Sequence, residues 1–93
     1  MKKIVEIEYV GIEDVQEIVE DVFEILRNTK HYISVVMEEI CGSTMFKCYI
    51  MLDGFDADKN FDYSYSFKLS DDERDVSEMN GCKNVLKNLL AEG

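Results

Sequence analysis

Residues 12–26 read IEDVQEIVEDVFEIL, and their pattern predicts an amphipathic helix. Gly11 stands just before the stretch, where it can serve as the helix N-cap. Basic residues follow it, where the helix dipole favours them. We therefore expect a helix over residues 12–29. At about 100° per residue, its apolar stripe comprises Val15, Ile18, Val19, Val22, Ile25 and Leu26, with Ile12 and Phe23 at its edge.

Three stretches that follow this helix predict strands. Residues 31–41 are rich in β-branched side chains, and residues 45–53 follow them after a short Gly-Ser-Thr turn. These two stretches are expected to form a hairpin. The turn-rich residues 53–60 lead to residues 61–69, where aromatic and polar side chains alternate as in a half-buried strand.

The two ends of the chain complete the pattern. Residues 3–10, KIVEIEYV, alternate between apolar and acidic side chains and predict a further strand. Ser70 and Glu73 fit a capping box, and the apolar spacing beyond them predicts a helix over residues 71–91. Gly81 costs up to about 1 kcal/mol relative to Ala inside a helix, so a kink or break is expected there.

The element order is therefore β-α-β-β-β-α in a single α+β domain that spans residues 1–93. We expect a four-stranded, mostly antiparallel sheet with both helices packed on one face. The side chains expected to face the helices are Val5, Ile33, Cys48 and Tyr63. The opposite face would carry Val36, Ile40, Met45, Tyr49 and Met51. A slip of one residue would exchange the two faces.

The net charge of the chain is −10, from 20 acidic residues and 10 lysines or arginines. The acids are concentrated in two blocks. Residues 4–26 hold eight acids and no base, and residues 53–75 hold eight acids against three bases. Such a charge repels nucleic acids and anionic membranes and attracts basic proteins.

The sequence also predicts a cytoplasmic protein. Three cysteines without a CxxC pair favour reduced thiols over a disulfide framework. Glu6 and Glu8 interrupt the apolar region that a signal peptide would need. No apolar run approaches the roughly 20 residues of a membrane span.

The acids of the 12–26 helix raise the question of their role. Acids that repeat every three or four residues destabilise a helix by about 0.2–0.5 kcal/mol for each pair, and a surface that serves only solubility usually mixes Lys with Glu. We interpret the acids as a docking surface for a basic protein, on which carboxylates stand in for phosphates. The alternative is a merely solvated face. The predicted docking residues are Glu13, Asp14, Glu17, Glu20, Asp21, Glu24, Asp56, Asp58, Asp71 and Asp72.

No motif predicts a catalytic residue, a metal site or a cofactor. An EF-hand loop that began at Asp56 would need Gly and Glu where this chain has Phe61 and Phe67. His31 is the only histidine, and one histidine cannot define a metal site or a catalytic triad. The chain has no Gly-rich phosphate loop and no GxSxG sequence. We expect a protein that is not an enzyme.

These observations favour a small acidic inhibitor that blocks a basic, nucleic-acid-binding protein and does not itself bind nucleic acid or membrane. Phage counter-defence proteins, such as anti-CRISPR and anti-restriction proteins, are inhibitors of this type. One alternative is an antitoxin or immunity protein that neutralises a basic toxin. Another is an oligomeric assembly domain, for example a homodimer, that uses the open sheet face. The residues of that face would be Val36, Met45, Tyr49 and Met51.

Overall fold

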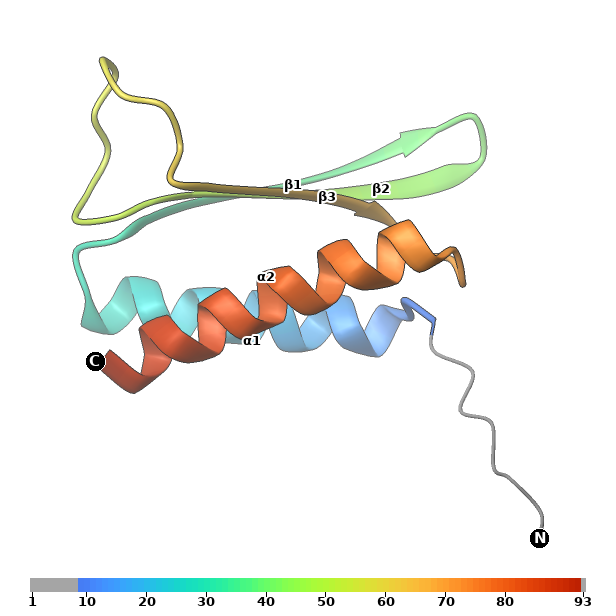
Figure 1. Ribbon diagram of the computed structural model, residues 1–93, viewed down its shortest axis with the longest axis horizontal. Coiled ribbons are helices and arrows are strands. Elements are labelled where there is room, and N and C mark those ends of the chain that lie inside the picture. The colour runs from blue at the N-terminus through green and yellow to red at the C-terminus, as the bar shows by residue number, and fades with distance from the viewer. Residues whose placement is uncertain (1–8, 93) are drawn as a thin grey trace, which may run out of the picture.

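Two helices pack on one face of a three-stranded antiparallel sheet in the computed structural model, which describes residues 9–92 (Figure 1). The strand order is β1-β2-β3, and the β1–β2 hairpin reaches beyond the helices at one end. The expected α+β class is confirmed. The elements in chain order are α1 (Ile12–Asn28), β1 (Tyr32–Ile40), β2 (Ser43–Met51), β3 (Tyr63–Lys68) and α2 (Glu73–Glu92).

The fourth strand expected over residues 3–10 lies mostly outside the described residues. Tyr9 and Val10 belong to no strand. Val10 is buried, and its N–H donates to the carbonyl oxygen of Ser70 at 2.7 Å. This hydrogen bond holds the chain that enters α1 beside the segment that enters α2.

The first helix follows the sequence prediction closely. Gly11 is its N-cap, and the N–H of Gly11 donates to Asp14 Oδ2 at 2.8 Å. The helix ends at Asn28. The hydroxyl of the next residue, Thr29, donates a hydrogen bond to the carbonyl oxygen of Ile25 at 2.8 Å. The buried residues keep the predicted spacing of three and four, and they are Val15, Ile18, Val22 and Ile25.

The β1–β2 hairpin is confirmed, but its turn is not the Gly-Ser-Thr segment that the sequence suggested. Ile40 pairs with Ser43, so Cys41 and Gly42 alone make the turn. Their φ angles are 50° and 81°. A two-residue turn with positive φ at both positions matches the right-handed twist of the strands, whereas a longer turn here would shift the register.

The strand register places the two faces of the sheet as predicted. Ile33 lies opposite Ile50, which lies opposite Tyr63, and these three face the helices. Val36 and Met45 fall on the opposite face, with Ile40, Tyr49 and Met51. Because the helix face carries the apolar side chains with the least exposure, burial fixes the register.

The second helix departs from the prediction at two places. Ser70 and Glu73 do not form the expected capping box, because α2 begins at Glu73 and Asp72 Oδ1 accepts the N–H of Arg74 at 2.8 Å. The helix also continues without a break through Gly81. A Cβ at Gly81 would lie 3.0 Å from the ring of Tyr65, so the glycine allows α2 to approach β3 closely.

The link between β2 and β3 rises from one end of the sheet, on the side away from the helices (Figure 1). The ring of Phe55 lies 5.0 Å from that of Tyr32, and the ring of Phe61 stacks on Tyr49 at 4.9 Å. Met51 is consequently only 2% exposed. The strand that we expected over residues 61–69 starts two residues later, at Tyr63. The β2–β3 link covers part of the sheet face that we predicted to be open.

Candidate functional site

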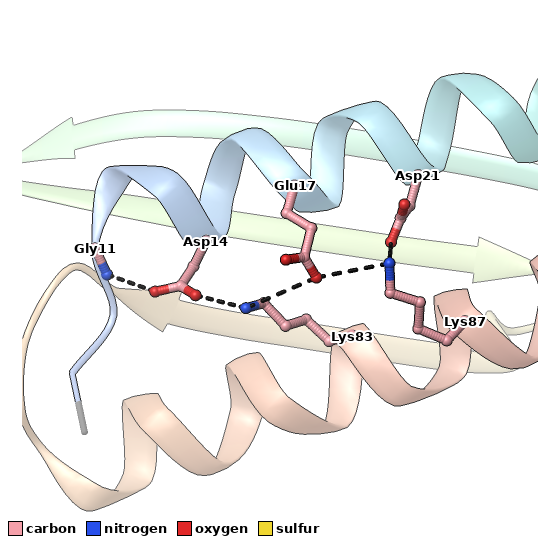
Figure 2. Close-up of polar contacts among 6 residues, drawn as sticks. All are labelled: Gly11, Asp14, Glu17, Asp21, Lys83 and Lys87. Carbon is pink, nitrogen blue, oxygen red and sulfur yellow. Dashed lines mark hydrogen bonds and ion pairs between the residues drawn. The ribbon is translucent and has the colours of Figure 1, made fainter. Parts of the chain in front are cut away.

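Two lysines of α2 meet three of the α1 acids that the sequence assigned to partner binding (Figure 2). Lys83 Nζ donates to Asp14 Oδ1. Lys87 Nζ lies 2.9 Å from Asp21 Oδ2. Glu17 Oε2 sits between the two ammonium groups, at 3.9 Å and 3.7 Å. These three acids therefore help to join the helices.

Asp14 makes two contacts with its two oxygens. Oδ2 accepts the N–H of Gly11, and Oδ1 accepts the ammonium of Lys83. Burial by itself raises the pKa of Asp14, but the hydrogen bonds from Lys83 and Gly11 outweigh it and hold the pKa below its usual 3.8. Asp14 is thus an N-terminal helix acceptor and an ion-pair partner, with a side chain that is 22% exposed.

Asp21 is the most shielded of the three acids, with a side chain that is 13% exposed. The hydrogen bond to Asp21 is the largest of the effects that raise the pKa of Lys87, and Glu17 adds to it. A carboxylate this shielded needs a nearby positive charge. We conclude that Asp21 and Asp14 belong to the helix–helix interface.

Among the described residues, the other three α1 acids form no ion pair with α2, although Glu13 and Glu24 line hollows that α2 residues also line. Glu13, Glu20 and Glu24 are exposed, and they lie within about 40° of arc on the helix. Glu24 Oε2 pairs with Arg27 Nη1 at 3.2 Å, an exposed contact within one helix. We call Glu13, Glu20 and Glu24 the acidic ridge, and this ridge is the candidate site.

The acids of the second block lie elsewhere. Asp56 and Asp58 belong to the loop on the side of the sheet away from the helices, whereas Asp71 and Asp72 precede α2 (Figure 1). Asp56 Oδ1 accepts the N–H of Asp58 at 2.9 Å, which is an ordinary turn interaction. The structure thus gathers the six α1 acids on one helix but does not bring the other four to them.

Asp75 is a structural acid that the sequence interpretation did not single out. It is 8% exposed, and its Oδ1 and Oδ2 accept the Lys68 N–H at 3.1 Å and the Ser70 hydroxyl at 2.7 Å. The signal was its position beside Val76 and four residues before Met79, on the apolar side of α2. The sequence interpretation also did not single out Lys83 and Lys87 as partners of the α1 acids, although their spacing of four residues placed them on one helix face.

The contacts of His31 and the burial of two of the cysteines indicate structural roles. His31 Nδ1 accepts the N–H of Asp53 at 3.0 Å, so the ring holds the start of the β2–β3 loop. Cys48 and Cys82 are fully buried, and Cys41 is exposed in the hairpin turn. Within residues 9–92, no three His, Cys, Asp or Glu side chains gather in a way that could hold a metal ion.

Two properties of the whole chain bear on the site. No helix in the described part of the chain is long and apolar enough to cross a membrane. Comparison with protein-family models, with curated proteins and with solved structures finds no match.

Proposed function

We propose that this protein is a non-catalytic inhibitor that docks on a basic surface of another protein, a surface that otherwise holds nucleic-acid phosphates. The observation that carries the proposal is the acidic ridge of α1. Its three glutamates are exposed on one side of a rigid helix, in a stretch of 15 residues that contains no base.

We propose that Glu13, Glu20 and Glu24 make the direct contacts with the partner. Asp14 and Asp21 are held by Lys83 and Lys87, so they contribute to the field but are not available for direct contact. Glu17 is 45% exposed and can contribute at the edge of the ridge. The remaining glutamates present acceptors to arginine and lysine side chains, which bind carboxylates as they bind phosphates.

The ridge is long enough to engage several basic side chains. Glu13 and Glu24 are 11 residues apart, which corresponds to about 16 Å along a helix axis. DNA carries a charge every few ångström along its axis, so a phosphate-binding groove of similar length offers several cations. We propose that the protein blocks a nucleic-acid-binding enzyme, as anti-CRISPR and anti-restriction proteins do.

The test is capture of partners from nuclease-treated lysate on the immobilised protein, with washes at low and high salt and identification by mass spectrometry. We expect a basic nucleic-acid-binding protein that is retained at low salt, released at high salt and displaced by added DNA or RNA. The variant with Glu13→Lys, Glu20→Lys and Glu24→Lys should lose this protein.

A matched control separates the ridge from net charge. The variant with Asp56→Lys, Asp58→Lys and Asp71→Lys changes the net charge by the same amount at exposed positions away from α1. It should retain the partner. Equal loss with both variants would show that the ridge is not the docking site, and capture that salt does not affect would contradict the proposal.

A second candidate is an assembly domain that uses the open sheet face. Val36 and Met45 are only half-buried there, beside an ion pair between Lys47 and Glu38 at 3.0 Å. The β2–β3 loop covers the other end of this face, which leaves a small apolar area. An oligomer that persists at high salt and is broken by Met45→Lys, measured by light scattering, would favour this candidate over the inhibitor.

A further inference from the structure

One side of α1 carries apolar side chains at the border of the core, of which Val19 packs against the core and the others are largely exposed. Ile12, Phe23 and Leu26 are 52%, 62% and 42% exposed, and Val19 between them is half-buried. These four side chains fall within about 60° of arc, next to the core stripe on the side of the helix away from Asp14 and Asp21. We call them the outer flank of α1.

The outer flank adjoins the edge of the sheet. β1 is an edge strand of the described sheet, and its Met37 is 52% exposed although it lies on the helix side. A hollow of about 430 Å³ lies between Met37 and the N-terminal half of the flank, and Phe23 and Leu26 continue the apolar surface beyond it. Its walls are formed by Ile12, Val15, Gln16, Val19, Glu20 and Met37.

The acidic ridge meets this hollow at Glu20. Glu20 belongs to both, and Glu13 and Glu24 lie farther around the helix. The surface of α1 therefore changes from apolar to acidic across its width. An occupant that matches it needs an apolar stripe with basic residues along one side.

We infer that the outer flank of α1 and Met37 form a docking groove for an amphipathic helix of the partner protein, whose apolar stripe fills the groove and whose basic residues meet the acidic ridge. This inference rests on the proposed function, because it names the element of the basic partner that binds. The flank extends from residue 12 to residue 26, about 21 Å, which corresponds to about four turns of a partner helix.

The negative charge of this chain favours a basic helix of a partner protein over a second copy of the chain as the occupant of the groove. Two copies that met flank to flank with their α1 helices antiparallel would bring two acidic ridges together, and in any arrangement each copy carries a net charge of −10. Glu38 and Glu39, exposed on the outer half of β1, oppose edge-to-edge pairing of two β1 strands for the same reason.

The test uses two defined synthetic peptides of about 18 residues, each long enough to span the groove as a helix. Both carry the same leucine stripe, and the polar positions are lysine in one and glutamate in the other. Fluorescence polarisation at low salt should show binding of the Leu/Lys peptide and at least tenfold weaker binding of the Leu/Glu peptide. The double variant Phe23→Gln and Leu26→Gln should weaken binding of the Leu/Lys peptide at least tenfold.

The matched control is Ile40→Gln with Leu52→Gln, which removes two exposed apolar side chains elsewhere without changing the charge. It should bind as the unmodified protein does. Equal loss in the control, or equal binding of the two peptides, would overturn the inference. A dimer that Phe23→Gln and Leu26→Gln dissociate would also overturn it, as would tighter peptide binding after deletion of residues 1–8, which would make those residues the occupant.

The experiments distinguish failure of the docking groove from failure of the proposed function. If the lysate yields no basic partner while the peptide binds through Phe23 and Leu26, the groove stands and the proposed function falls. If the partner is captured through Glu13, Glu20 and Glu24 but is indifferent to Phe23→Gln and Leu26→Gln, the proposed function stands and the groove is excluded.

Discussion

At the scale of single residues, Lys83 and Asp14 show how an acid that looks like a binding residue can serve the fold. Replacement of Lys83 by Met should lower the free energy of unfolding by about 1 kcal/mol near pH 7, because a half-buried carboxylate loses its cation. Urea denaturation followed by circular dichroism measures this difference. Lys59→Met, an exposed loop position with the same charge change, is the control and should have little effect.

The same pair predicts a pH dependence. Because the pKa of Asp14 in the folded state is below its usual 3.8, its contribution is complete above the unfolded value and is lost as the pH falls through the folded value. The difference between the unmodified protein and Lys83→Met should therefore shrink below about pH 4. A difference that stays constant down to pH 2.5 would show that the lysine acts through packing instead.

Asp75 gives a second prediction at this scale. Asp75→Ala leaves the backbone N–H of Lys68 without its acceptor, which should cost about 2 kcal/mol of stability. Asp71→Ala, four residues earlier and exposed, should change stability by no more than about 0.5 kcal/mol. Chemical denaturation of the two variants side by side would contradict this account if their midpoints fell equally.

At the scale of elements, the hairpin turn offers a stabilising change. Cys41 has a φ of 50°, and Asn is the non-glycine residue that best tolerates this left-handed conformation before a glycine. Cys41→Asn should raise the unfolding free energy by about 0.5 kcal/mol, and Cys41→Val should lower it because a β-branched side chain is strained there. Thermal denaturation of both variants measures the direction of each change in stability. Two changes in the same direction would contradict the two-residue turn at Cys41 and Gly42.

At the scale of the whole molecule, net charge acts on stability. With 20 acids against 10 bases, self-repulsion opposes compaction, and salt screens it. We expect the melting temperature to rise by about 5 °C, which corresponds to about 1 kcal/mol for a domain of this size, when NaCl is raised from about 0.05 M to about 0.5 M. A fall would show that the ion pairs of Lys83 and Lys87 outweigh the repulsion.

Much of the architecture could be read from the order of the residues. The period of the apolar residues located both helices and the three strands within a few positions. The alternation in β1 and β2 also assigned Val36, Met45 and Tyr49 to the face away from the helices. These predictions succeed because a helix and a strand each impose their own spacing on the residues that must be buried.

The predictions that failed depend on contacts between distant residues. A kink or break was expected at Gly81, but the glycine lies against Tyr65 of β3 and the helix continues through it without a break. The turn expected at residues 42–44 moved to Cys41 and Gly42, because the strand register leaves only two residues for it. In both cases a local preference gave way to packing.

The sequence by itself determined the class of elements, their approximate bounds, the faces of the sheet and the excess of negative charge, because each follows from composition or local period. Only the tertiary structure decided which acids are available. It placed Lys83 and Lys87 beside Asp14 and Asp21, left Glu13, Glu20 and Glu24 exposed, and kept Asp56 and Asp58 on the other side of the sheet. The physical reason is that the availability of a charge depends on its neighbours in space, and folding sets these neighbours across 60 to 70 residues of chain.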